Sequence, residues 1–430
     1  MKIPNFNNYT VDHLFLLIGE NPLPNYVAAK LLLAKGGIPH FIYTTDTDET
    51  AKRLATILQN EGFKPAKMRS LEDRESDAFR IENVVQQELD TITTGKIGIN
   101  YTGGTKTMAV HAYRTLCYEK KNNSYQKRLN IQFSYLDPRH LEMCIEEGSD
   151  LIRLKIRPDT LEIKLPKLFQ IHQLELDHDP VREPILPELA VALAQLYSDI
   201  EAKDNLTQWR NWFYEIFSRS ARKEKSDETL GDWKNKTEIL KLSFPIEILP
   251  DNIQKQFQDL KFLDGDGLLA IAEVQKQGYF SKPKNFGKWL EGIWLEHYVL
   301  RVVQEIASQI SVKHYGLDFS IPLAGTEQGF QFDVAFTRGY QLFAISCSTT
   351  SDRQLCKSKL FEACLRAEQM GGSEAKVALV CCSDEPDTLQ AELSTLVGNN
   401  KLRVFGRDDL VELPDRIIEW VKLVEKKQDE

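Results

Sequence analysis

The sequence contains no long hydrophobic run. None of its apolar stretches approaches the roughly 18 residues that a membrane-spanning helix requires. The first ten residues, MKIPNFNNYT, also lack the apolar core of a secretion signal. These two absences predict a cytoplasmic protein that makes no contact with a membrane.

Paired cysteines and an excess of positive charge are missing as well. The seven cysteines include no CxxC pair, which is typical of reduced thiols and argues against a structural zinc site. Lys and Arg number 54 against 63 Asp and Glu, so the formal net charge is -9. This acidic balance argues against a protein that coats duplex nucleic acid, although a small local site for a phosphate remains compatible with it.

The composition that is present predicts a globular α/β protein of several domains. Hydrophobic residues make up 42% and charged residues 27% of the 430 positions, and that length suits two or three domains. The pattern of helix and strand signals changes twice along the chain. We therefore expect an N-terminal ligand-sensing domain at 1–168, a mostly helical connector at 169–286, and a C-terminal α/β domain at 287–430.

Strand and helix patterns alternate in the first 150 residues. Short apolar strands are predicted at 14–19, 40–44, 97–101 and 131–136, with helices at 26–34, 51–58 and 107–117. Strands separated by helices predict parallel pairing and a doubly wound, Rossmann-like sheet. Alternating apolar residues at about 150–170 predict a hairpin around Pro158 or an extension of the sheet. The C-terminal part predicts a helix at 294–306, an antiparallel pair at 330–336 and 341–347, a helix at 355–370 and a strand at 375–382.

The strongest local signal is the segment IGINYTGGTKTM at 97–108. A strand ends at Tyr101, two glycines form the turn, and a helix begins near Thr105. Such a junction directs free backbone N–H groups and the positive end of a helix toward one point, which suits an anion. Threonine hydroxyls and the ammonium of Lys106 add further donors. The segment predicts a phosphate site, and a tight turn without a ligand is the alternative.

The spacing does not fit the two common nucleotide-binding motifs. In the pattern GxxxxGK[ST] the lysine follows the second glycine directly, whereas Lys106 comes two places too late after Gly103. The dinucleotide pattern GxGxxG normally follows the first strand, and this loop follows a later one.

Residues 1–165 resemble the CRISPR-associated Rossmann fold (CARF) family, through the TGGTK-x-M loop at 102–108 and the polar loop GENPLPN at 19–25. The resemblance implies binding of a cyclic oligoadenylate, cyclic tetra-adenylate being the commonest case, by a homodimer that shares one ring. Open α/β sheets bind ligands at the carboxyl ends of their strands. The expected ligand contacts are Gly19, Asn21, Asn25, Thr44, Thr45, Tyr101, Thr102, Gly103, Gly104, Thr105, Lys106, Thr107 and Met108.

The resemblance also implies an activity, that of a ring nuclease. In such sites the ribose 2′-OH attacks the adjacent phosphate without a metal cofactor and leaves a 2′,3′-cyclic phosphate. Positioning and charge stabilisation supply the rate. We expect Lys106 at the phosphate and Asn21 or Thr44 near the ribose.

A second candidate site lies in the C-terminal part. The segment GIWLEHY at 292–298, with Glu296, and a later Asp333 resemble the PD-(D/E)xK nuclease domain that accompanies CARF domains. In that fold an Asp and a Glu hold Mn²⁺ or Mg²⁺, and a lysine polarises the attacking water. The strand that carries ExK in the family reads Ser346-Cys347-Ser348 here, so we expect a degenerate site.

Two alternatives to ring cleavage remain open. If Lys357 or Lys359 reaches the site from the next helix, Glu296 and Asp333 are expected to bind metal and cut single-stranded RNA or DNA. A non-catalytic sensor that binds the ring and acts through a partner is the other alternative.

Overall fold

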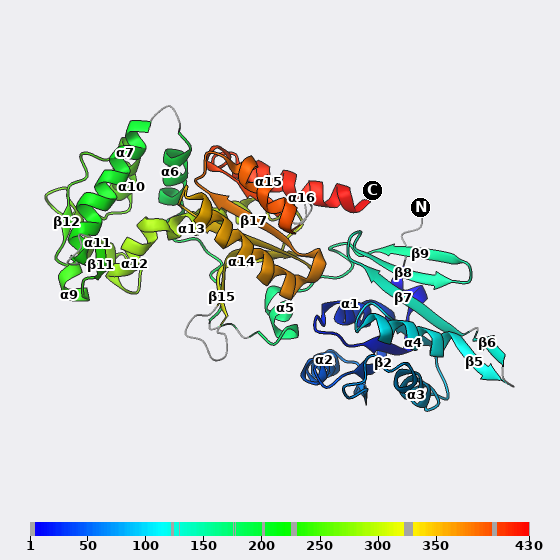
Figure 1. Ribbon diagram of the computed structural model, residues 1–430. Helices are drawn as coiled ribbons and strands as arrows, with labels where there is room; N and C mark the ends of the chain where they lie inside the picture. The colour runs from blue at the N-terminus through cyan, green and yellow to red at the C-terminus, as the bar shows by residue number, and fades with distance from the viewer. Residues whose placement is uncertain are drawn as a thin grey trace.

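The computed structural model describes residues 5–121, 124–128, 130–174, 176, 178–199, 203–224, 230–321, 330–397 and 402–429. Two mixed α/β parts and one helical part lie in a row, and the C-terminal sheet occupies the middle (Figure 1). The spatial order therefore differs from the order along the chain. No helix within these described ranges is long and apolar enough to cross a membrane.

The N-terminal sheet has seven strands in the order β3-β2-β1-β4-β7-β8-β9. The strands are β1 (Val11–Leu17), β2 (Leu33–Tyr43), β3 (Lys67–Ser70), β4 (Ile97–Asn100), β7 (Ile131–Asp137), β8 (Glu142–Glu147) and β9 (Asp150–Lys155). Pairing is parallel from β3 to β7 and antiparallel from β7 to β9. The predicted doubly wound sheet is confirmed.

Helices connect the parallel strands. They are α1 (Leu23–Leu32), α2 (Asp48–Asn60), α3 (Ala78–Leu89) and α4 (Lys106–Cys117), and a β-hairpin of β5 (Tyr118–Lys121) and β6 (Ser124–Lys127) follows α4. The chain passes from β1 outward to β2 and β3, then returns to β4 on the other side of β1. The carboxyl ends of β1 and β4 are thus neighbours at the topological switch point, where open α/β sheets bind ligands.

Of the two alternatives for the region around Pro158, the sheet extension is confirmed, because β9 forms the last strand of the sheet, and the hairpin at Pro158 is wrong. The hairpin there consists of β8 and β9, and its turn lies at Gly148, whose φ of +65° suits glycine. Pro158 instead belongs to the segment that leads to helix α5 (Leu165–Ile171).

The central part of the chain is mostly helical, as expected, and its large aromatic residues form its core. Trp209 and Trp212 are fully buried, with ring centroids 5.7 Å apart. The elements are α6 (Pro187–Ser198), α7 (Lys203–Asn211), a π-helical segment (Trp212–Ser218), α8 (Arg219–Ala221), β10 (Arg222–Glu224), β11 (Leu230–Trp233), α9 (Lys236–Ile239), β12 (Ser243–Phe244), α10 (Asp251–Asp259), β13 (Leu269–Ala270), α11 (Ile271–Lys276) and α12 (Pro283–Lys288). The exact domain boundaries stay predictions.

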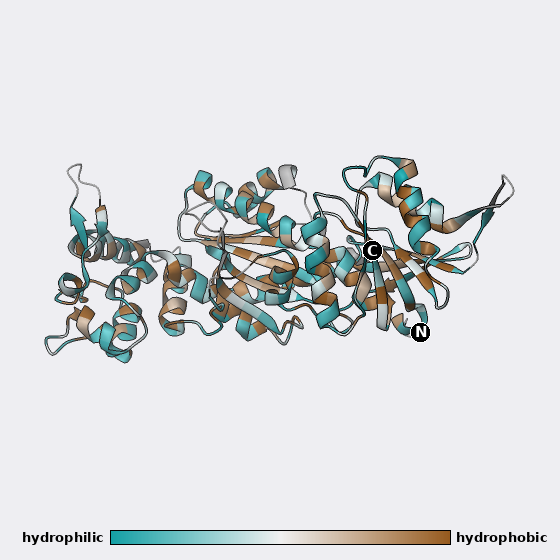
Figure 2. Cartoon of the chain, turned by 90° about the horizontal axis from the view of Figure 1, so that it is seen from below, coloured by the Kyte–Doolittle hydropathy of each residue, from teal (hydrophilic) through white to brown (hydrophobic). Residues whose placement is uncertain are grey.

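The C-terminal sheet has five strands in sequence order, the first three antiparallel and the last three parallel. They are β14 (His314–Ile321), β15 (Phe330–Arg338), β16 (Gln341–Ser348), β17 (Lys376–Cys381) and β18 (Leu402–Phe405). The helices are α13 (Trp294–Ile306), α14 (Arg353–Gly371), α15 (Pro386–Val397) and α16 (Leu413–Asp429). Figure 2 shows apolar strands flanked by helices with polar outer faces. The predicted central hairpin is confirmed, whereas β14, β18 and α15 were not anticipated.

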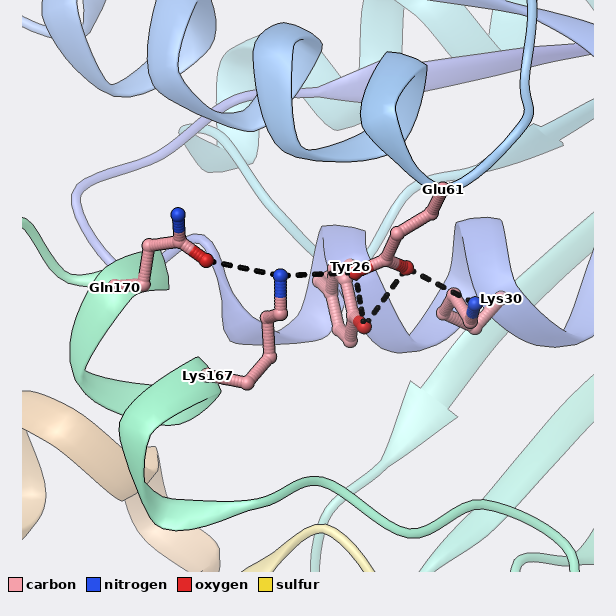
Figure 3. A network of polar contacts seen from close by, with 5 residues as sticks. All are labelled: Tyr26, Lys30, Glu61, Lys167 and Gln170. Carbon is pink, nitrogen blue, oxygen red and sulfur yellow. Dashed lines mark hydrogen bonds and ion pairs between the residues drawn. The ribbon is translucent and has the colours of Figure 1, made fainter.

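A polar network ties α5 to the N-terminal part (Figure 3). The carboxylate of Glu61 accepts hydrogen bonds from Tyr26 Oη at 3.0 Å and Lys30 Nζ at 2.9 Å, and it lies 3.1 Å from Lys167 Nζ. Tyr26 and Lys30 belong to α1, Glu61 ends α2, and Lys167 belongs to α5. Helix α5 is thereby held against helices α1 and α2 of the N-terminal part.

Candidate functional site

Two glycine-containing loops meet at the switch point. A Cβ atom on Gly19, after β1, would lie 3.0 Å from the backbone nitrogen of Gly104, after β4. A Cβ atom on Gly103 would lie only 2.2 Å from the carbonyl oxygen of Leu17, and Gly104 has a φ of +71°. Glycine is therefore required at these positions for the two loops to pack this closely.

Helix α4 begins directly after this contact. Thr105 is its N-cap, and the Thr105 hydroxyl accepts a hydrogen bond from the N–H of Met108 at 3.2 Å. Helix geometry leaves the N–H groups of the first residues, Lys106 and Thr107, without an intrahelical partner. The Lys106 side chain is exposed and forms no ion pair with any residue that the structure describes. A cation in the first turn opposes the helix dipole, so an external anion would stabilise this arrangement.

Two of the predicted contact residues, Asn25 and Met108, are buried beneath the glycine loop and pack against it. Asn25 is fully buried, and its Nδ2 donates to the carbonyl of Leu17 at 2.9 Å. Met108 is also fully buried, and its Cε would lie 3.1 Å from a Cβ on Gly104. Neither side chain is open to a ligand in this structure, so both are better described as loop supports.

Tyr101 and Thr102 fasten the start of the same loop. The Tyr101 hydroxyl donates to Glu146 Oε1 at 2.8 Å, and burial together with this carboxylate raises the pKa of Tyr101. The Thr102 hydroxyl accepts the N–H of Leu136 at 2.6 Å. The sequence showed these residues as ligand candidates, and the structure engages both side chains within the sheet.

The polar residues predicted near the ribose are also engaged. Thr44 is almost buried, and its backbone N–H and hydroxyl both bond the Thr47 hydroxyl, at 2.9 and 3.1 Å. Asn21 contacts Leu23 and His172, and Thr45 is exposed at the same edge of the sheet. The groups that remain open at the junction are Gly19, Gly103, Gly104, Thr105, Lys106 and Thr107.

The second candidate site lies between β15, β16 and α14. Asp333 Oδ2 accepts hydrogen bonds from Ser346 Oγ at 3.1 Å and from the Cys347 N–H at 2.6 Å. Lys359 Nζ donates to the carbonyl of Cys347 at 2.8 Å. Of the two lysines considered, Lys359 therefore reaches this region, whereas Lys357 pairs with Glu392 instead.

Burial and like charges perturb the carboxylates of this second site. Burial, with the charge of Asp333, raises the pKa of Glu296 to about 8, and Lys359 opposes the rise. Burial also raises the pKa of Asp333. Asp318 adds negative charge to both groups, and it has an unusual left-handed φ of +63°. No sequence motif marked Asp318, because it appears as a single acid in an apolar strand.

These residues do not fit a divalent cation well. Hard cations need several oxygen ligands, usually including charged carboxylates. Ser346 occupies the position of the expected carboxylate and donates to Asp333, and Ser348 is almost buried. Among the described residues, no three His, Cys, Asp or Glu side chains gather as a metal site would require.

Comparison with known proteins agrees with the N-terminal assignment. Residues 14–138 match the family model of the Card1 CARF domain. The fold of almost the whole chain is similar to protein VC1899 from Vibrio cholerae, with 16% identity, a TM-score of 0.66, and coverage of 96% of this chain and 98% of that one. No curated protein sequence matches the chain.

Two further solved structures share the fold. Can2 from Sulfobacillus thermosulfidooxidans, in complex with cyclic tetra-adenylate, has 15% identity, a TM-score of 0.64, and coverage of 95% of this chain and 99% of that one. A type III CRISPR defence DNA nuclease activated by cyclic oligoadenylate has 12% identity and a TM-score of 0.50, and the match covers 86% of this chain and 45% of that one. The expected CARF resemblance is confirmed for the N-terminal part, whereas the nuclease class of the C-terminal part stays a prediction.

Proposed function

We propose that this chain binds a cyclic oligoadenylate, with cyclic tetra-adenylate as the first ligand to test, at the junction of Gly19, Gly104 and Lys106. The single observation that carries the proposal is the exposed Lys106 without an ion pair among the described residues, at the first position of α4 beside the partly exposed backbone of Gly103 and Gly104. The CARF match over residues 14–138 and the similarity to Can2, solved with this ring, support it. The corresponding biological role is type III CRISPR defence.

A homodimer makes this site sufficient for a polyanionic ring. One copy supplies one lysine and one helix N-terminus, whereas two copies around a twofold axis supply two of each. Calorimetry combined with light scattering should find one ring bound per two chains. Failure of the wild type to bind the ring at all would contradict the proposal.

We further propose slow cleavage of the ring without a metal. The ribose 2′-oxygen forms a bond to phosphorus, the bond from phosphorus to the 5′-oxygen breaks, and the proton of the 2′-OH ends on the leaving oxygen. The donors that we assign to the phosphate charge are Lys106 and the N–H groups of Gly104 and Thr105, because the Thr44 hydroxyl is engaged with the Thr47 hydroxyl.

The test is an incubation of excess protein with the ring in EDTA. Linear products that carry a 2′,3′-cyclic phosphate support ring cleavage, and Lys106→Ala should abolish them. An intact ring after long incubation, with binding demonstrated in the same sample, would leave the chain as a sensor without ring nuclease activity.

A metal-dependent nuclease is the second candidate function. The observation in its favour is that Lys359 reaches Cys347 beside Asp333, as a migrated catalytic lysine would. The serine at position 346 and the poor ligand set weigh against it. Cutting of single-stranded RNA or DNA with ring and Mn²⁺ present would favour this candidate, and no cutting under those conditions would exclude it.

A further inference from the structure

The helical connector carries a basic segment without acidic residues. Residues 274–290 contain four lysines and no Asp or Glu, although the whole chain has a net charge of -9. The segment covers the end of α11, the whole of α12 and the start of a π-helical segment (Trp289–Ile293). It lies in the helical part, at the opposite end of the row from the N-terminal sheet (Figure 1). Neither candidate site described above includes it.

Buried aromatic rings fix the backbone of this segment. Phe286 is fully buried, and its ring centroid lies 5.6 Å from those of Phe262 and Phe280. Pro283 is buried at the first position of α12. Gln275 Nε2 donates a hydrogen bond to the carbonyl of Phe280 at 2.8 Å. The segment is therefore ordered before any partner binds, which lowers the entropic cost of binding.

Three exposed lysines alternate with the buried residues. Lys282, Lys284 and Lys288 are exposed, and none of them forms an ion pair with any residue that the structure describes. Lys284 and Lys288 are four positions apart in α12, so they share one face of the helix, with Cβ atoms about 6 Å apart. We call these three residues the lysine face. Unpaired cations this close repel one another, so an external polyanion would stabilise them.

The acidic side chains of the neighbouring helices α9 and α11 already have partners. Both helices contact α12. Glu238 of α9 accepts the N–H of Asn235 at 3.1 Å, in the cap of its own helix. Glu273 of α11 pairs with Lys276 at 3.1 Å. These two carboxylates therefore leave the lysine face without a counter-ion.

An exposed aromatic ring lies next to the lysine face in the sequence. Tyr279 is 43% exposed, and its ring is nearly perpendicular to that of Phe262, with centroids 6.1 Å apart. A further exposed lysine, Lys261, is nearby, because Gln277 Nε2 donates to its carbonyl at 3.4 Å. A base of a single strand can stack on an open aromatic ring, whereas the bases of a duplex are already stacked on one another.

We propose that the helical connector binds single-stranded RNA or DNA, with phosphates on the lysine face and a base stacked on Tyr279. Lysine contacts to phosphate read no base edge, so the surface accepts either nucleic acid without sequence preference. An acidic peptide would pair with the lysines but offers no base to Tyr279. This binding requires neither the cyclic ring nor a metal, and the inference does not rest on the proposed function.

Fluorescence anisotropy of labelled oligonucleotides tests this surface. Oligo(U) RNA and oligo(dT) DNA of about 20 nucleotides, and a DNA duplex of the same length, are titrated with the full chain. The buffer contains EDTA and no cyclic ring, and the salt concentration is varied. We expect the two single strands to bind with affinities within about threefold of each other, and the duplex at least about tenfold more weakly.

Removal of the lysine face should weaken this binding. The combined variant Lys282→Ala, Lys284→Ala and Lys288→Ala should bind single strands at least about tenfold more weakly than the wild type. The slope of log affinity against log salt concentration should fall by about two, since each phosphate contact contributes about 0.7. A matched control, which should bind as the wild type does, removes three exposed lysines from the N-terminal part, namely Lys35→Ala, Lys64→Ala and Lys96→Ala.

Tyr279→Ala tests the stacking contribution separately. It should weaken single-strand binding about fivefold without changing the salt slope, and Tyr279→Phe should retain the wild-type affinity. Tyr214→Ala is the control, because Tyr214 is a tyrosine of the same helical part with a similar exposure, 49%. Melting temperatures show whether each variant is folded.

The outcomes separate the partner classes. A wild type that binds neither single strand, or binds only one of them, overturns the inference, and so does a lysine-face variant that binds as its control does. Tighter binding of the duplex, or equal binding of polyglutamate, assigns the surface to another partner and also overturns it. Single-strand binding that is weakened in the lysine-face variant and in Tyr279→Ala, but kept in both controls, supports it.

Discussion

The two candidate sites differ in how they use their charges. At the N-terminal junction the neighbouring polar side chains, such as Thr44 and Thr102, are engaged in the fold, while the cation of Lys106 is left open. In the C-terminal site Asp333 accepts from Ser346 and Cys347, and Lys359 donates to Cys347. At the first site Lys106 is available to an external anion, whereas at the second site Asp333 and Lys359 already have hydrogen-bond partners within the fold. A similar fold thus gives no guarantee of similar chemistry at each of its sites.

The largest effect on the difference between the two sites is expected when the close contact between Gly103 and Leu17 is disturbed. Gly103→Ala would place a methyl group 2.2 Å from the Leu17 carbonyl, so we expect a loss of about 3 kcal/mol in the free energy of unfolding and loss of ring binding. Denaturant unfolding measures the first effect and calorimetry the second. Gly265→Ala, with open space around its methyl group, is the control, and equal effects of the two variants would refute the packing argument.

The raised pKa of Glu296 in the C-terminal site predicts that the free energy of unfolding depends on pH. Because the pKa of Glu296 is raised to about 8, the folded state holds a proton that the unfolded state loses, and stability falls as pH rises toward and through 8. Glu296→Gln removes this penalty. Its stability advantage over the wild type should grow by about 2 kcal/mol between pH 5 and pH 9. If Glu296→Gln and the wild type differ in stability by the same amount at pH 5 and pH 9, Glu296 is not protonated in the folded state.

The cap of α4 contributes a smaller effect. Thr105→Ala removes the acceptor for the Met108 N–H and should cost about 1 kcal/mol of stability. It should also weaken ring binding modestly, because the N–H groups of the first turn lose their fixed direction. Thr56→Ala, whose hydroxyl bonds a carbonyl within α2, is the control for a threonine lost from a helix. If Thr105→Ala and Thr56→Ala lose similar amounts of stability and ring affinity, the capping role of Thr105 is contradicted.

The smallest expected effect concerns metal. Mn²⁺ should leave the melting temperature of the wild type unchanged, because the second site lacks a suitable ligand set among the described residues. Ser346→Glu restores a carboxylate beside Asp333 and should make the melting temperature depend on Mn²⁺, as specific binding to the folded state requires. Stabilisation of the wild type as large as that of the variant would instead favour the metal-dependent nuclease.

The sequence predicted the elements that have strong local patterns. Helix 294–306 was predicted at the bounds that the structure has, and the TGGTK loop was correctly located between β4 and α4. Short polar strands such as β3, with the sequence KMRS, carry no apolar alternation and were missed. The alternation at 150–170 correctly predicts an extension of the sheet, but it does not locate the turn, which forms at Gly148 and not at Pro158.

The roles of individual site residues were less predictable. Whether Asn21 faces a ligand or His172 depends on α5 and α14, which are about 150 and 350 residues away along the chain. Sequence spacing also could not separate Lys357 from Lys359, since the choice depends on which carbonyl or carboxylate each one reaches. Such contacts are set by tertiary packing.

Ring affinity of Lys106→Ala tests the central claim most directly. Calorimetric titration with cyclic tetra-adenylate should show an affinity at least about tenfold weaker than that of the wild type, because each chain loses one charge-assisted contact to phosphate. Lys96→Ala, an exposed lysine next to the opposite end of β4, removes the same charge and should bind as the wild type does. Equal affinities for Lys106→Ala and the wild type would contradict a phosphate site at the start of α4.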